Sequence, residues 1–343
     1  MSLSDIQVGI WNIIGLMTGI PSGGTHFYVD PVNGSDSNAG TKDSPFATLY
    51  KAHSNMTAGK HDVCHLVSDG TTAGSARLSK ALAQAVDSTA TTGLLTWSKN
   101  CAHLVGESAP GCATNRARIA PPSGVYTEAT FNSTSFVSVT GTGCVFANFE
   151  AFQGFSTGAA AQICWTDAGR NTYIGCNIAG MGDTASAVDT GSRSLLLTGS
   201  VGESTFYRCT IGLDTVARTV ANASVEFAGG TPRNRFIECT FPFYVTGSGT
   251  GALAFITSLA GAMDRHQIIR SCSFLNASKS GAGTNAAYLA TLAASSGGYL
   301  LFDGFTTMVG FTGYGSDATS RGQIYVNGAQ PNNATGISVA PNA

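Results

Sequence analysis

Five segments of the chain repeat one short pattern, and their spacing constrains the fold more than any other feature. Each segment has an apolar residue, two further residues, a cysteine or an aromatic residue, one polar residue and usually a second apolar residue. The segments are Tyr173–Ile178, Phe206–Ile211, Phe236–Phe241, Ile269–Phe274 and, less regularly, Phe302–Thr307. They recur at a nearly constant interval, which falls in the range of about 20–50 residues that indicates stacked units. Short alternating segments separated by Gly, Ser, Thr and Asn indicate that the units consist of strands.

The repeat predicts a column of side chains inside a solenoid. Because neighbouring strands lie about 4.7–4.9 Å apart, residues at the same position in successive coils lie above one another. We therefore expect an internal ladder of Cys176, Cys209, Cys239, Cys272 and Phe305. A free cysteine packs as a small apolar side chain. A metal site or a disulfide chain is the alternative, and the wide separation favours packing, because metal-binding cysteines usually occur in closely spaced pairs.

The composition indicates a folded protein with a weakly charged surface. Of the 343 residues, 43% are hydrophobic and only 11% are charged, against about 25% charged residues in typical soluble domains. The formal net charge of −2 gives no electrostatic signature of a nucleic-acid partner or an anionic membrane, so we expect neither. Nine cysteines, an odd number at scattered positions, favour a protein made in a reducing cytoplasm over a secreted disulfide scaffold.

The segment 1–24 is predicted to form a separate apolar arm. One face of a helix would carry Ile6, Ile10, Ile13, Ile14 and Met17, with Trp11 at its edge, before the turn at Pro21–Gly24. The arm lacks the positive start and cleavage site of a signal peptide, and it is too short and too interrupted to span a bilayer comfortably. We expect it to cap its own solenoid or to insert into a partner.

The segment that follows resembles a known family. Residues 27–52 read FYVDPVNGSDSNAGTKDSPFATLYKA, which predicts a strand, a turn rich in Asp and Asn, and a helix with Ser44 as N-cap and Pro45 at its first position. This run is similar to the segment that opens right-handed parallel β-helix proteins of the pectate-lyase-like superfamily, and most similar to phage virion structural β-helix proteins. The resemblance implies an all-β solenoid. It leaves the activity open, because lyases, hydrolases and phage structural proteins share this segment.

The predicted organisation has three parts. They are an N-terminal arm (1–24), a parallel β-helix (25–313, with the opening strand and capping helix in 25–60) and an irregular C-terminal tail (314–343). Val63–Val67 and Cys101–Gly106 are expected to contain the first strands of successive coils. The segments 191–202, 247–251 and 277–283, rich in Gly and Ser, are expected to be turns between strands.

The sequence offers few candidates for catalysis or metal binding. Glycosidases need a pair of carboxylates, and Asp183 and Asp214, at similar offsets after their coil cysteines, are the candidates, with turn formation as the alternative. Possible oxygen ligands for calcium are Asp30, Asn33, Asp36 and Asn38, but the EF-hand spacing is absent. His61 and His65 share a face without an evident third ligand. We therefore expect neither a metal nor a cofactor.

Two functions of different classes fit these features. The first is a non-enzymatic virion protein, a bacteriophage capsid decoration protein that is made in the host cytoplasm, assembles as a homotrimer and binds the major capsid protein or another virion protein. It is favoured by the apolar arm and by the low charge, which is typical of obligate interfaces. The alternative is a tailspike or carbohydrate-active β-helix enzyme that cleaves or binds host polysaccharide. Sugar rings would then stack on aromatic residues among Trp97, Trp165, Tyr126, Tyr244, Tyr288, Tyr299 and Tyr314.

Overall fold

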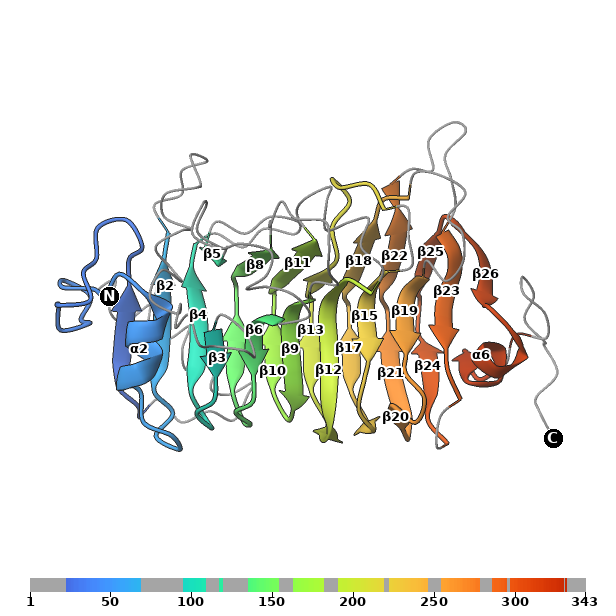
Figure 1. Cartoon of the computed structure of the whole chain (residues 1–343), viewed down its shortest axis with the longest axis horizontal. Helices are drawn as coiled ribbons and strands as arrows, with labels where there is room; N and C mark the ends of the chain where they lie inside the picture. The colour runs from blue at the N-terminus through green and yellow to red at the C-terminus, as the bar shows by residue number, and fades with distance from the viewer. Residues whose placement is uncertain are drawn as a thin grey trace.

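The chain winds as a right-handed parallel β-helix, as the repeat predicts. The computed structural model describes residues 23–68, 95–108, 117–119, 135–153, 163–181, 191–218, 222–245, 254–277, 286–294, 297–329 and 331. Three long parallel sheets run side by side along the molecule from its N-terminal to its C-terminal end (Figure 1). The predicted arm up to residue 22, Asp183 and the segment 332–343 lie outside the described residues.

Each coil contributes strands to the three sheets. The first sheet contains β1 (His26–Val29), β2 (Val63–Val67), β4 (His103–Glu107), β7 (Val145–Ala147), β10 (Thr172–Ile174), β13 (Thr205–Tyr207), β17 (Arg235–Ile237), β21 (His266–Arg270), β24 (Tyr299–Asp303) and β27 (Ile324–Val326). The second contains β5 (Arg118–Ile119), β8 (Glu150–Gln153), β11 (Asn177–Met181), β14 (Thr210–Ile211), β18 (Thr240–Phe243), β22 (Ser273–Asn276) and β25 (Thr307–Val309). The third contains β3 (Leu95–Trp97), β6 (Ser135–Val139), β9 (Ile163–Gly169), β12 (Arg193–Gly202), β15 (Ala223–Phe227), β19 (Ala254–Ser258), β23 (Ala286–Leu292) and β26 (Phe311–Gly315).

Shorter elements complete the described part of the fold. β16 (Thr231–Pro232) pairs with β20 (Met263–Asp264) at one corner. Helix α2 (Leu49–Asn55) lies at the N-terminal end of the solenoid and α6 (Ala318–Gly322) lies near its C-terminal end (Figure 1). Helix α2 buries Leu49 and Ala52 against the first coils, so the apolar end of the stack is covered.

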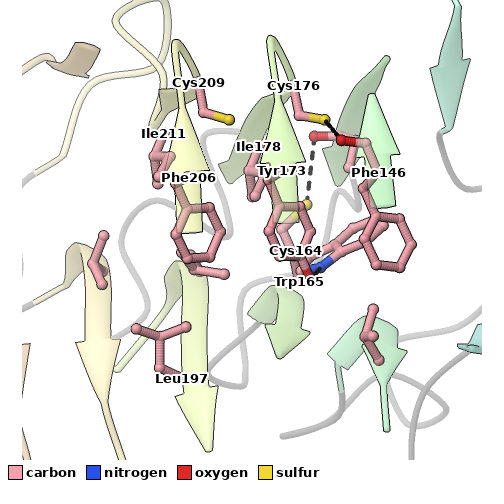
Figure 2. Packing of buried hydrophobic residues seen from close by; sticks show 14 of the residues in the cluster. Phe146, Cys164, Trp165, Tyr173, Cys176, Ile178, Leu197, Phe206, Cys209 and Ile211 are labelled. Atoms are coloured by element: carbon pink, nitrogen blue, oxygen red, sulfur yellow. Dashed lines mark hydrogen bonds between the residues drawn. The ribbon is translucent and has the colours of Figure 1, made fainter. Parts of the chain in front are cut away.

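The predicted cysteine ladder is confirmed for its four cysteines. Cys176, Cys209, Cys239 and Cys272 are buried, unbonded, and lie at equivalent turns of successive coils; Figure 2 shows the first two. The thiol of Cys176 donates to the carbonyl of Phe146 at 3.2 Å, and neighbouring cysteines of the ladder repeat this type of contact. The four cysteines therefore pack as buried side chains in the core, as predicted.

Aromatic rings stack along the same interior (Figure 2). Phe146, Tyr173, Phe206 and Phe236 occupy one column of the first sheet, with centroid separations of 4.9, 4.5 and 4.8 Å and nearly parallel planes. Phe241 and Phe274 stack in the second sheet at 4.5 Å. The spacing between these rings equals the spacing between strands, so each ring contacts the coils on both sides.

The prediction for Phe305 is wrong. Its side chain is 89% exposed instead of lying in the ladder. Ile269 pairs with Phe302 in the first sheet, and Ser273 pairs with Thr307 in the second sheet. The chain from Phe302 to Thr307 is thus one residue longer than the equivalent chain from Ile269 to Ser273. This extra residue in the turn directs Phe305 outward and leaves the residue before Thr307 at the ladder position.

The helix predicted from Ser44 begins four residues later. Its N-cap is Thr48, whose hydroxyl accepts from the backbone N–H of Lys51. The segment before the cap is held by strand pairing, because Phe46 forms a bridge with Val29. Asp36 accepts from the N–H groups of two residues, one of them Thr48, and this fixes the start of the helix.

Two other predicted boundaries also change. Residues 193–202 form strand β12, because Leu195 and Leu197 point into the core and outweigh the surrounding Gly and Ser. The turns predicted at 247–251 and at 277–283 lie outside the described residues, apart from Ala277. The solenoid continues past the predicted boundary at residue 313, since β27 pairs with β24 and α6 packs on β23 and β26.

Candidate functional surface

The outer face of the first sheet carries aliphatic and tyrosine side chains among polar ones. Side chains alternate between the two faces of a strand, and the register gives two outward columns along this sheet. One column is Val63, His103, Val145, Thr172, Thr205, Arg235, Ile268, Leu301 and Tyr325; the other is His65, Val105, Ala147, Ile174, Tyr207, Ile237, Arg270 and Asp303. We call these two columns the outer face.

Several members of the outer face keep apolar area in contact with solvent. Ile174, Tyr207, Ile237, Ile268 and Leu301 are all partly exposed. A sheet face that is open to water usually carries polar side chains, and contiguous exposed apolar surface marks interaction sites. This arrangement can bury area against another molecule, and its aliphatic members offer no acid, base or nucleophile.

Charged side chains on this face and in the turns beside it pair with one another between successive coils. Glu203 accepts from Arg233 at 2.6 Å and from Arg170 at 3.2 Å. Arg270 likewise donates to Asp303, on the neighbouring coil, at 2.6 Å. The arginines hold the pKa of Glu203 and of Asp303 below the ordinary carboxyl value, so both carboxylates are ionised at neutral pH and neither is poised as a general acid.

The predicted carboxylate pair is not assembled within the described residues. Asp214 lies exposed in the turn after β14, while Asp183 falls outside them, so their pairing remains a prediction. The neighbouring charged residues have other partners. Arg193 pairs with Glu226 at 2.7 Å, and the guanidinium of Arg218 is buried over the ring of Phe243 at 4.4 Å.

A cluster of histidines occupies the N-terminal end of the molecule. His65 on β2 is nearly fully buried, and its Nδ1 lies 2.5 Å from Oε1 of Glu107 on β4. Its Nε2 lies 2.8 Å from Nδ1 of His26 on β1, and its ring stacks on Tyr28 at 4.5 Å. The sequence showed that His61 and His65 share a face, but each binds a histidine on another coil, since Nδ1 of His61 lies 3.2 Å from Nε2 of His103.

The oxygen-rich turn after β1 is occupied by internal hydrogen bonds. Asp30 accepts from the backbone N–H groups of Val32 and Asn33, both at 2.9 Å. Asp36 accepts from the residues that lead into α2. These contacts match the turn interpretation of the sequence. Across the described ranges, no three His, Cys, Asp or Glu side chains are placed to hold a metal ion.

Two tryptophans considered for sugar stacking serve the core instead. Trp97 and Trp165 are fully buried. Their indole N–H groups donate to the carbonyl of Ala102 and the hydroxyl of Tyr173, both at 3.0 Å. Tyr126 lies outside the described residues. None of the helices among the described residues has the length and apolar character that crossing a membrane requires.

One of the other aromatic candidates, Tyr299, lines a groove near the C-terminal end. Tyr299 of β24 and Tyr325 of β27 line a groove of about 370 Å³, with their ring centroids 5.2 Å apart. Thr319 and Gln323 add polar groups, and three glycines form part of the lining. Nε2 of Gln323 donates to two backbone carbonyls, whereas its Oε1 is buried without a hydrogen bond.

Comparisons with known proteins add a likeness of fold. No known protein family and no curated protein matches the sequence. Among solved structures, the pectin methylesterase from Aspergillus niger is 14% identical, with 89% of this chain and 90% of that chain covered and a TM-score of 0.42. A rhamnogalacturonan lyase is 15% identical, with coverage of 88% and 87% and a TM-score of 0.37. Likenesses this distant assign no activity to this chain.

Proposed function

We propose that the protein is a non-enzymatic structural protein of a bacteriophage particle, which assembles as a homotrimer and decorates the capsid. The observation that carries the proposal is the apolar outer face of the first sheet. Five successive coils each contribute one of its apolar or tyrosine members. Ile174, Tyr207 and Ile237 lie in one column, and Ile268 and Leu301 lie in the neighbouring column. Burial of apolar area contributes about 25 cal/mol per Å², so a face of this kind is stabilised by a second copy.

The charges support the same assignment. Ion pairs such as Arg270–Asp303 are satisfied within one chain, so neighbouring copies do not need to match their charges across an interface. Obligate interfaces are depleted of charge and enriched in apolar area. Three copies related by a threefold axis along the solenoid would each bury the same face, and closed symmetry ends the assembly at a defined size.

A charge-insertion experiment tests the interface. We expect the wild-type chain to scatter light as an oligomer, and the double variant Ile174→Glu, Leu301→Glu to be a monomer. The strand partners of both positions are uncharged, so two carboxylates placed there in a buried interface would lack partners. The matched control is Leu275→Glu, which changes an aliphatic residue with 38% exposure on the second sheet and should leave the oligomer intact. A wild-type protein that is monomeric at every concentration would contradict the proposal.

The location on the particle is tested by imaging. Electron microscopy of assembled particles should show threefold clusters of this protein on the capsid surface, with the major capsid protein as the contacting partner. Incubation of the purified protein with bacterial surface polysaccharides should release no fragments. Density confined to the tail, or release of oligosaccharides, would favour the alternative of a tailspike.

A second candidate function, binding of host polysaccharide, is favoured by the groove between Tyr299 and Tyr325. Its volume falls within the usual range of ligand sites, about 300–1,000 Å³, and tyrosine faces are suited to stacking on sugar rings. We expect Tyr299→Ala and Tyr325→Ala to lose any binding seen on a glycan array. Tyr50→Ala serves as control, because this half-exposed tyrosine lies on helix α2 at the other end of the molecule. Binding that survives both groove changes would exclude the groove.

A further inference from the structure

Histidines are concentrated at one end of the solenoid. Five of the six, namely His26, His53, His61, His65 and His103, lie in or between β1, α2, β2 and β4. We call these four elements with the turns between them the N-terminal cap. The sixth histidine, His266, lies on β21, five coils further along the first sheet. Because histidine is the side chain that changes charge between about pH 5 and 8, titration of histidines in this range is concentrated in the cap.

His53 joins helix α2 to the next coil through an unprotonated nitrogen. Its Nε2 accepts from the backbone N–H of Ser98 at 3.2 Å, and its ring packs on Trp97 at a centroid distance of 4.7 Å. The charged group that faces it is the ammonium of Lys99, which donates to the carbonyls of His53 and two further residues at the end of α2. Protonation of Nε2 would remove the acceptor and place two positive charges together.

His103 makes the same type of connection one coil further on. Its Nδ1 accepts from the backbone N–H of Val145 on β7 at 3.0 Å. Its Nε2 therefore carries the proton and donates to Nδ1 of His61. Asp62 faces this pair, and its carboxylate is already engaged by the backbone N–H groups of Thr25 and Thr57 at 2.7 Å each.

A third connection holds β1 to the cap. A single proton lies between His26 and His65, whose nitrogens are 2.8 Å apart, while Glu107 binds the far nitrogen of His65. Asp62 and Glu107 are the carboxylates that face His26, and Lys42 faces Glu107. Protonation of both rings would bring two imidazolium ions together within one stacked pair.

The pKa values agree with this geometry. Burial, with Lys99 as a smaller cause, lowers the pKa of His53 to about 4. Burial, together with His61, lowers the pKa of His103 to about 4. Burial and then His65 also lower the pKa of His26. A base whose pKa is lower in the folded state binds protons better once it is released, so opening is favoured as pH falls below about 6.5 and the effect is complete near pH 4.

We propose that the N-terminal cap is an acid-triggered latch, in which protonation of His53 and His103 releases α2, β1, β2 and β4 from the coils behind them. The coils from β10 to β24 stay wound, because the hydrogen bonds that join them do not use a histidine acceptor in the described residues. The residues that carry the proposed interface begin at Ile174, two coils beyond His103, so the latch does not use them. It gives the protein a way to open one end without unfolding.

Hydrogen exchange of the full chain tests the latch. After correction for the intrinsic exchange rate, we expect peptides within residues 26–67 and 95–107 to lose protection between pH 7.5 and 4.5, by roughly tenfold or more per histidine. Peptides of the coils from β10 to β24 should keep theirs. The proposal would be overturned if all coils lost protection together, or if the protection of the cap were unchanged at pH 4. Both outcomes can be measured on the wild-type protein alone.

Two neutral substitutions isolate the histidines. Gln places an amide oxygen close to the position of Nε2, and Asn places one close to Nδ1, so His53→Gln and His103→Asn keep the acceptor for Ser98 and Val145 without titrating. The double variant should retain cap protection at pH 4.5, and each single variant should retain part of it. His266→Gln is the control and should open like the wild type. A folded double variant that opens as readily as the wild type would refute the latch.

Discussion

Replacing Phe236 with aspartate is expected to abolish soluble, folded protein. The ring of Phe236 is fully buried, stacks on Phe206 at 4.8 Å and meets the edge of Phe241 at 5.8 Å. A carboxylate at this position would be buried without a partner, at a cost of several kcal/mol. The total stability of a domain is about 5–15 kcal/mol, and the loss of contacts to both neighbouring coils adds to the cost. Soluble yield and circular dichroism of the purified variant measure the effect.

Two controls separate this effect from a general intolerance of the ladder. Phe305→Asp introduces the same charge at a phenylalanine that the repeat places inside but the structure places outside, and we expect normal folding. Cys209→Ala removes only a buried sulfur and should reduce the free energy of unfolding by about 1–3 kcal/mol, whereas Cys209→Asp should behave like Phe236→Asp. Normal thermal melting of the Phe236 variant would contradict the stacked core.

The difference between these two phenylalanines shows what the sequence could and could not reveal about the fold. The regular period predicted the coils and the four buried cysteines correctly, because each coil repeats the same inward positions. It failed at Phe305, which keeps the usual spacing from Cys272 although the turn that contains it has an extra residue. The spacing between repeats does not show whether an extra residue lies before or after the ladder position.

The candidate sites were harder to predict because they depend on register between coils of unequal length. His26 and His65 are 39 residues apart, and His61 and His103 are 42 residues apart, so both separations exceed the regular period of the later coils. Their pairing therefore left no signal in the repeat. The apolar outer face had a weak signal, since Ile237 and Ile268 follow the inward Phe236 and precede the inward Ile269 in their strands. Alternation could have placed both outside, but only the sheet order shows that they line one face.

The second large effect concerns a carboxylate inside the solenoid. Asp167 is fully buried and accepts from Nδ2 of Asn171 at 2.7 Å, from the hydroxyl of Tyr173 at 2.8 Å and from that of Ser204 at 2.5 Å. These partners come from the turn after β9, from β10 and from the turn before β13, so one side chain joins adjacent coils. Asp167→Ala would leave three buried donors without this acceptor, at about 1–3 kcal/mol for each group left unsatisfied. We expect a loss of at least about 3 kcal/mol in urea unfolding.

The isosteric change Asp167→Asn, in contrast to Asp167→Ala, should not destabilise the fold at pH 7. Its amide oxygen still accepts from Tyr173 and Asn171, its amide nitrogen donates to the oxygen of Ser204, and the buried charge is gone. Burial raises the pKa of Asp167 above the ordinary value of 3.8. An acid with a raised pKa stabilises the fold most when protonated, and this stabilisation is lost as pH rises through the folded-state pKa. The asparagine variant should therefore match or exceed the wild type at pH 7, and its advantage should shrink as pH falls towards 4. A constant difference between the two proteins across this range would show that Asp167 does not titrate with folding.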